Sequence, residues 1–192
     1  MPIKLEASIK HTYALIFAIF FISGCVNFGG IHKYPEDWTP LESVSELKRF
    51  EGKYENIGAG NSMGSRMPTH ELWYFLTRQK TKGTRNENVK IAFSTPSTLN
   101  LTLLLDEKTI SSYTLTQGKD FEYKGESIVL SNSSGFSRDA FAMGFGTASF
   151  CIHLTSNGGL VGEINGASTG LLLYLIPAVG FGREWNYWKK VN

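Results

Sequence analysis

The sequence predicts a mainly β protein, an antiparallel meander of about eight short strands that closes into a barrel or a sandwich. Three observations lead to this expectation. The chain has 20 glycines, 13 phenylalanines and 8 tyrosines but no long tract of helix-forming residues. Apolar and polar residues alternate over most of the chain after residue 50. Clusters of Gly, Pro, Asn and Ser separate the alternating segments, as hairpin turns require.

The first elements of the expected domain lie between residues 48 and 90. Residues 50–56 alternate in the manner of a half-buried strand, and a loop rich in Gly, Ser and Met covers 58–68. Residues 69–77 predict one short helix that Thr69 caps, although a strand is the alternative. The polar residues 80–88 predict an exposed turn.

The middle of the chain has the clearest two-residue period. Residues 89–93 place Val, Ile and Phe at alternate positions, and four leucines alternate with other residues over 99–105. Residues 94–97 between them contain Pro and Ser, so a hairpin with one apolar face is predicted. Three further short strands are expected over 110–116, 121–123 and 128–130.

The last part of the chain contains a polar segment and two further hairpins. Residues 132–138 predict a loop, while 141–146 have no clear assignment. Two alternating segments, 148–154 and 160–164, flank the turn sequence Ser156-Asn157-Gly158-Gly159. The final pair of strands covers 171–176 and 183–191.

Aromatic residues concentrate in the final strand. Trp185 and Tyr187 share one face, which we expect to point inward, and Trp188 lies on the opposite, exposed face. Because aromatic residues are enriched at the centres of protein interfaces, Trp185, Tyr187 and Trp188 are the candidate interaction surface.

The N-terminus carries the features of an export signal that ends at a cysteine. Lys4 and Lys10 precede the apolar run 13–22, which is too short to span a membrane, and Phe21-Ile22-Ser23-Gly24-Cys25 follows. This order resembles the lipobox of bacterial lipoproteins. The resemblance implies removal of residues 1–24 and lipidation of Cys25. The alternative is an N-terminal core helix or an uncleaved anchor, in which Cys25 is a small apolar residue.

The resemblance also implies where the mature protein resides. Val26 follows the cysteine instead of the aspartate that tends to retain lipoproteins in the inner membrane. We therefore expect anchoring to the outer membrane, on the periplasmic side rather than the cell surface. Residues 25–47 show no sustained period, and their glycines and prolines predict a flexible tether between the anchor and the domain.

A second resemblance concerns the domain at 48–192. Gly52-Lys53-Tyr54 at the first strand, about eight meandering strands and a basic, aromatic last strand resemble the lipocalin-like barrels of bacterial envelope lipoproteins. The lipocalin pattern has tryptophan where Tyr54 stands. This resemblance implies an architecture and no assignable site.

Catalytic and metal-binding patterns are incomplete. Residues 166–170 fit Gly-x-Ser-x-Gly, but every histidine precedes Ser168, so a glycine-rich turn or bulge is expected instead. His70-Glu71 lacks the second histidine of a zinc helix. Cys151 and His153 share a strand face but form only half of a zinc site. We expect no enzymatic activity, no metal and no cofactor.

Three classes of function remain after these exclusions. A net charge of +2 gives no indication of nucleic-acid binding. The first expectation is a membrane-anchored structural or interaction module of the cell envelope. The alternative is a carrier that holds a small apolar ligand or lipid inside the barrel, and an enzyme comes third. An internal cavity of about 300 Å³ or more would favour the carrier.

Overall fold

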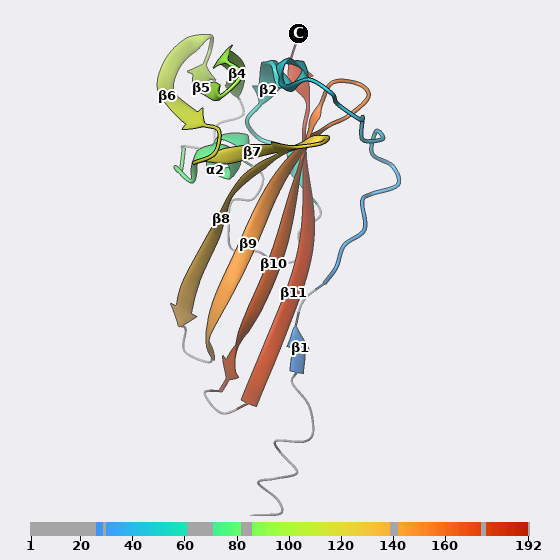
Figure 1. Cartoon of the computed structure of the whole chain (residues 1–192), viewed down its shortest axis with the longest axis vertical. Helices are drawn as coiled ribbons and strands as arrows, with labels where there is room; N and C mark the ends of the chain where they lie inside the picture. The colour runs from blue at the N-terminus through green and yellow to red at the C-terminus, as the bar shows by residue number, and fades with distance from the viewer. Residues whose placement is uncertain are drawn as a thin grey trace, which may run out of the picture.

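The computed structural model describes residues 26–28, 30–60, 71–81, 86–138, 142–173 and 176–191. These residues form two β-sheets, one of seven strands and one of five (Figure 1). The expectation of a mainly β protein built from antiparallel hairpins is confirmed. Within the described chain neither sheet closes on itself, so the arrangement corresponds to the sandwich that the sequence also allowed and not to a barrel.

The seven-stranded sheet contains the longest strands of the protein. Its order is β1 (Val26–Phe28), β11 (Ile176–Trp188), β10 (Leu160–Leu172), β9 (Ala142–Leu154), β8 (Ser127–Arg138) and β7 (Phe121–Lys124), with β3 (Ala59–Gly60) also paired to β11. The pair β1–β11 is parallel, and the other pairs are antiparallel.

The five-stranded sheet follows the expected hairpins of the middle of the chain. Its order is β12 (Lys190–Val191), β2 (Gly52–Glu55), β4 (Glu87–Thr95), β5 (Thr98–Leu105) and β6 (Lys108–Thr116). The alternating leucines Leu99, Leu101 and Leu103 are buried, as their period predicts. They pack in one core with residues of the larger sheet, such as Phe150 and Trp188. A short 3-10 helix, η1 (Leu47–Phe50), adds the buried Phe50 to this core.

The predicted helix is present as α2 (Leu72–Thr77), and Thr69 lies outside the described residues. Its N-cap residue, Glu71, makes no side-chain capping bond. The backbone carbonyl of Asn56 accepts from the Leu72 N–H, and the Asn56 side chain accepts from the Trp73 N–H, both at 2.8 Å. A residue distant in sequence therefore satisfies the free N–H groups at the start of this helix.

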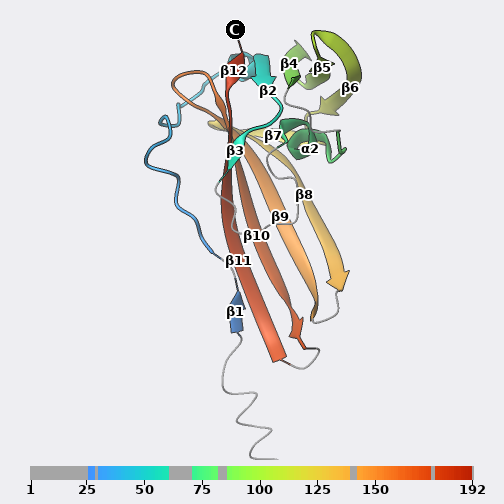
Figure 2. The ribbon, with the colours of Figure 1, turned by 180° about the vertical axis from the view of Figure 1, so that it is seen from behind.

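Strands β8 to β11 extend well beyond the two-layered part of the molecule (Figures 1 and 2). We call the extending part, residues 131–138, 142–149, 165–172 and 176–183, the blade, and the two-layered part the head. The prediction of a polar loop at 132–138 is wrong, because these residues are the second half of strand β8. The prediction of a turn or bulge at 166–170 is also wrong, because these residues are part of β10 and pair continuously with both β9 and β11.

The segment 30–47, which we call the strap, is not the free tether that its composition predicted. The N–H of His32 donates to the carbonyl of Arg183, and the N–H of Glu42 donates to the carbonyl of Leu154. Val44 is buried in the core. Tyr34 and Trp38 of the strap cover the face of the larger sheet that the core does not use, where they pack against Trp185 and Tyr187.

Candidate functional site

The blade is the candidate functional site, because its two faces differ sharply in side-chain size. Residues directly opposite each other in an antiparallel pair lie on the same face. The strand register therefore assigns one face, the aromatic face, to Ser134, Phe136, Arg138, Met143, Phe145, Thr147, Ser149, Asn165, Ala167, Thr169, Leu171, Pro177, Val179, Phe181 and Arg183. It assigns the other, the small-residue face, to Ser133, Gly135, Ser137, Ala142, Gly144, Gly146, Ala148, Gly166, Ser168, Gly170, Ala178, Gly180 and Gly182, with the larger Leu172 and Ile176 at the free end.

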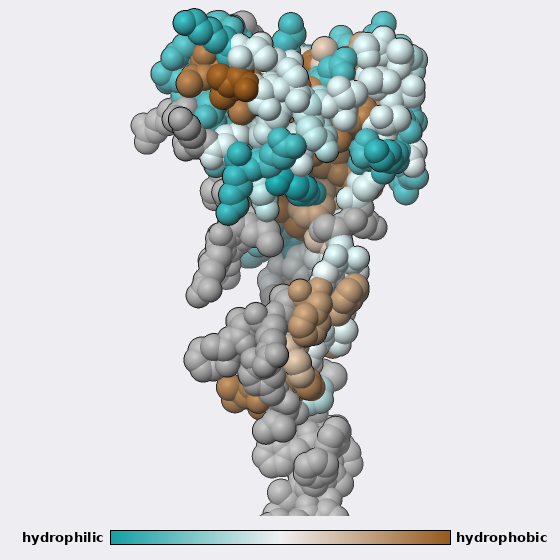
Figure 3. Space-filling view, turned by 90° about the vertical axis from the view of Figure 1, so that its left-hand side faces the viewer, coloured by the Kyte–Doolittle hydropathy of each residue, from teal (hydrophilic) through white to brown (hydrophobic). Residues whose placement is uncertain are grey.

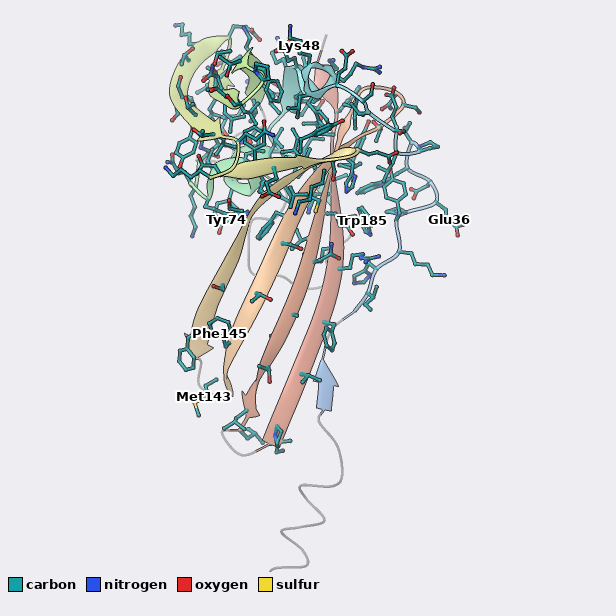
Figure 4. The ribbon with its side chains drawn as sticks, viewed as in Figure 1. Glu36, Lys48, Tyr74, Met143, Phe145 and Trp185 are labelled. Carbon is teal, nitrogen blue, oxygen red and sulfur yellow. The ribbon has the colours of Figure 1, made fainter. Side chains whose placement is uncertain are left out.

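The aromatic face is open to solvent. Phe136 is 67% exposed, and Phe145 and Phe181 are each 50% exposed. Phe136 and Phe145 are directly opposite each other on β8 and β9. Figure 3 shows hydrophobic residues on the blade beneath a mostly hydrophilic head, and Figure 4 places Phe145 and Met143 toward the free end. Several large apolar side chains grouped on one surface indicate a binding surface rather than scattered exposure.

The small-residue face contains glycines that the internal packing of the chain does not require. A Cβ atom added to Gly135 or Gly182 would meet no atom within 4 Å. Gly144 and Gly170 near the free end are different, because a Cβ there would lie less than 3.0 Å from a backbone oxygen of the neighbouring strand, and a Cβ at Gly162 in the head would lie 2.7 Å from the ring of Trp188. Glycine weakens a strand, and its presence often marks close approach by another molecule. An open hollow of about 500 Å³ is lined by Gly135, Gly146, Gly166, Gly180 and Gly182, together with residues such as Ser134, Thr147, Ala167 and Phe181.

The first strand of the described chain lies beside the blade. Strand β1 pairs in parallel with β11, so that Val26 is opposite Ala178 and Phe28 is opposite Gly180 (Figure 2). Cys25, the expected lipidation residue, and the whole expected signal at 1–24 lie outside the described residues. Covalent connection nevertheless places Cys25 one peptide bond from a residue that pairs within the blade.

The interaction surface expected at Trp185, Tyr187 and Trp188 is not an exposed surface. Trp188 is 0% exposed and packs against Phe75, and Trp185 is only 7% exposed. The expected faces were inverted, because the face with Trp188 points into the core between the sheets. The strap covers the opposite face, where Tyr34 packs edge-on against Trp185 and Trp38 packs against the half-buried Tyr187.

A polar cluster lies on that covered face, at the junction of the head and the blade. His153 Nε2 lies 3.3 Å from Glu163 Oε2, and Arg183 Nε lies 3.2 Å from Glu163 Oε1. The hydrogen bond with His153 lowers the pKa of Glu163, and the Asn165 side chain and the charge of Arg183 act in the same direction against the effect of burial. The carboxylate is therefore ionised at neutral pH and forms a structural ion pair.

Cys151 is adjacent to this cluster, directly opposite Glu163 in the β9–β10 register. Burial, and then the charge of Glu163, raises the pKa of the Cys151 thiol. A protonated thiol is a poor nucleophile and a poor metal ligand. Among the described residues, no three His, Cys, Asp or Glu side chains come together so that they could hold a metal ion.

The remaining sequence patterns do not form a catalytic site in the described chain. Ser168 lies in the middle of β10 on the small-residue face, without the strand-turn-helix that a nucleophile elbow requires. His70 lies outside the described residues. Across the ranges that the structure covers, no helix is long and apolar enough to cross a membrane.

Sequence reasoning missed Phe136, Phe145 and Phe181, although a signal for them was present. Residues 143–147 and 179–183 alternate large residues with glycine or another small residue, a two-residue period with the small residues on one face. Apolar-polar alternation predicts a strand, and these segments instead alternate large with small residues.

Comparison of the sequence with protein-family models and with curated proteins gave no match, and comparison of the structure with solved structures gave none.

Proposed function

We propose that the protein is a lipid-anchored lipoprotein of the bacterial outer membrane that acts without catalysis, and that the blade is its interaction surface. The observation that carries the proposal is the exposed aromatic face, on the same sheet region with which β1, the start of the mature chain, pairs. The lipobox resemblance at 21–25 supports the anchor, and the lack of a catalytic cluster in the described residues gives no support to an enzyme.

The anchor is tested by replacing Cys25 with serine. The serine hydroxyl cannot form the thioether to a diacylglycerol, so Cys25→Ser should abolish labelling by a radioactive fatty acid and release the protein from membranes. Cys151→Ser is the matched control and should label normally. A Cys25→Ser protein that still takes up label would refute the lipobox interpretation.

The interaction surface is tested by photo-crosslinking in living cells. A photoreactive phenylalanine analogue at Phe145 should form crosslinked products. The same analogue at Ile110, which is also 50% exposed but lies on β6 in the head, should form none. Crosslinks from Ile110 but not from Phe145 would exclude the blade as the interaction surface.

A carrier of an apolar ligand is the second candidate function, although the ligand would not be held inside a barrel. Large side chains such as Trp73, Trp188 and Tyr54 fill the space between the two sheets. The feature that favours a carrier is the hollow of about 500 Å³ on the small-residue face of the blade. Mass spectrometry of an organic extract of the purified protein tests it, and an extract without lipid or other apolar compound counts against a carrier.

A further inference from the structure

We infer that the partner of the aromatic face is the lipid bilayer itself, and that the blade lies against the membrane surface with this face toward the acyl chains. The inference rests on the proposed lipid anchor and extends it, because it assigns a second, protein-based contact with the same membrane.

The chemistry of the aromatic face fits hydrocarbon. Phe136 and Phe145 form one cross-strand pair on β8 and β9. Phe181 lies on the same face of the sheet, on β11. Among the other described residues that the register places on this face, Arg138 and Arg183 carry a charge and lie at the two ends of the blade, and the rest are apolar, Ser, Thr or Asn. An apolar, aromatic face can contact either a protein or a bilayer, and the proposed lipid anchor next to β1 on the same sheet favours the bilayer.

The position of the chain start brings this face to the membrane. Val26 pairs with Ala178, the third residue of β11, so a lipid on Cys25 would enter the bilayer near the free end of the blade. Ala178 lies directly between Pro177 and Val179 in β11, and the register places these two neighbours on the aromatic face. An anchor at this place cannot hold the blade far from the lipid headgroups, and it raises the effective concentration of the aromatic face at the surface.

The edge of the sheet limits the depth of insertion. No strand in the described chain pairs with β8 from Ser131 to Arg138, so its outward backbone groups need water or headgroups. Open sheet edges do not occur in the hydrocarbon core. We therefore place the blade in the interfacial region, where the phenylalanine rings reach the acyl chains and the β8 edge remains hydrated.

The test uses the mature chain from residue 25 onward with Cys25→Ser, so that no lipid is attached. It is mixed with sucrose-loaded vesicles of phosphatidylethanolamine and phosphatidylglycerol, and the bound fraction is measured after centrifugation. The unlipidated chain should bind. The combined change of Phe136, Phe145 and Phe181 to serine should lower the partition coefficient by about a hundredfold, because three exposed aromatic side chains lose their apolar contact.

The matched control is Ile110→Ser, which removes an equally exposed apolar side chain from the head and should leave binding unchanged. Thermal melts of each variant verify that the fold is intact. Equal vesicle binding by the triple variant would overturn the inference, and so would self-association through these phenylalanines without vesicle binding. Release of an entrapped dye would overturn the interfacial depth. Because no acyl group is present, these results are independent of the Cys25→Ser labelling experiment.

Discussion

The head and the blade share the four strands β8 to β11, yet one face of these strands has opposite roles in the two regions. In the head, this face presents Phe150, Ile152 and Trp188 to the core. In the blade, it presents glycine, alanine and serine over most of its length, with Leu172 and Ile176 at the free end, and the phenylalanines lie on the opposite face. Alternation thus indicates a strand in both regions. Only in the head, however, do the large side chains point toward the core between the sheets.

The largest expected effect concerns Trp188 in the head. Trp188→Ala removes a fully buried side chain from the core and should lower the free energy of unfolding by about 3–5 kcal/mol. Trp185→Ala should cost roughly half as much, because Trp185 packs under the strap and its Nε1 donates to the His32 carbonyl. Urea unfolding of both variants measures the order. A larger loss for Trp185→Ala would show that the core lies on the other face of β11.

The strap should stabilise the head by a somewhat smaller amount. A shortened protein that begins at Leu47 loses Tyr34, Trp38 and Val44, so Trp185 and Tyr187 become exposed. We expect a loss of about 2–4 kcal/mol, the transfer free energy of one to two large apolar side chains. Thermal melts should compare it with a protein that begins at Gly30. Identical melting temperatures of the two proteins would show that 30–47 does not stabilise the head and is a flexible tether.

A pair of glycines should separate the two regions directly. Gly162→Ala in the head places a methyl group against Trp188 and should cost about 1–3 kcal/mol. Gly135→Ala in the blade meets no atom within 4 Å and should change stability by no more than about 0.5 kcal/mol. Chemical denaturation of the two variants measures the contrast. Similar losses would mean that the blade is packed as tightly as the head.

The smallest expected effect is on pH dependence at the junction of the two regions. Because the pKa of folded Glu163 is lowered, its contribution to stability is present above the ordinary value of 4.5 and is lost as the pH falls through the folded value. Glu163→Gln should therefore be less stable than the wild type at pH 6, and the difference should shrink toward pH 3. Unfolding curves measured over this range test the sign. A constant difference would exclude the ion pair as its cause.

Part of this protein follows from the sequence alone. The leucines of β5 and the turn at 156–159 were located correctly, because local alternation and turn residues specify a hairpin wherever they occur together. The helix over Leu72–Thr77 was also located correctly, although its N-terminal partner, Asn56, was not, since that bond joins residues distant in the chain.

The choice of the inward face of β11 depends on the tertiary structure. A two-residue period separates Trp185 and Tyr187 from Trp188 but does not say which set is inside. Both sets are buried in the head, one by the core and one by the strap. Because the strap has no period of its own, only its contacts with the sheet identify it as part of the domain.

The blade shows why local sequence patterns do not predict secondary structure where pairing with adjacent strands determines it. Residues 132–138 and 166–170 are rich in Gly, Ser and Asn, which have low strand propensity and are typical of turns. Adjacent strands supply hydrogen bonds along their length, and this pairing overrides the local preference. The sequence determined that the chain forms hairpins, and the tertiary structure decided how far each one extends, because strand pairing is a property of two segments and local composition is a property of one.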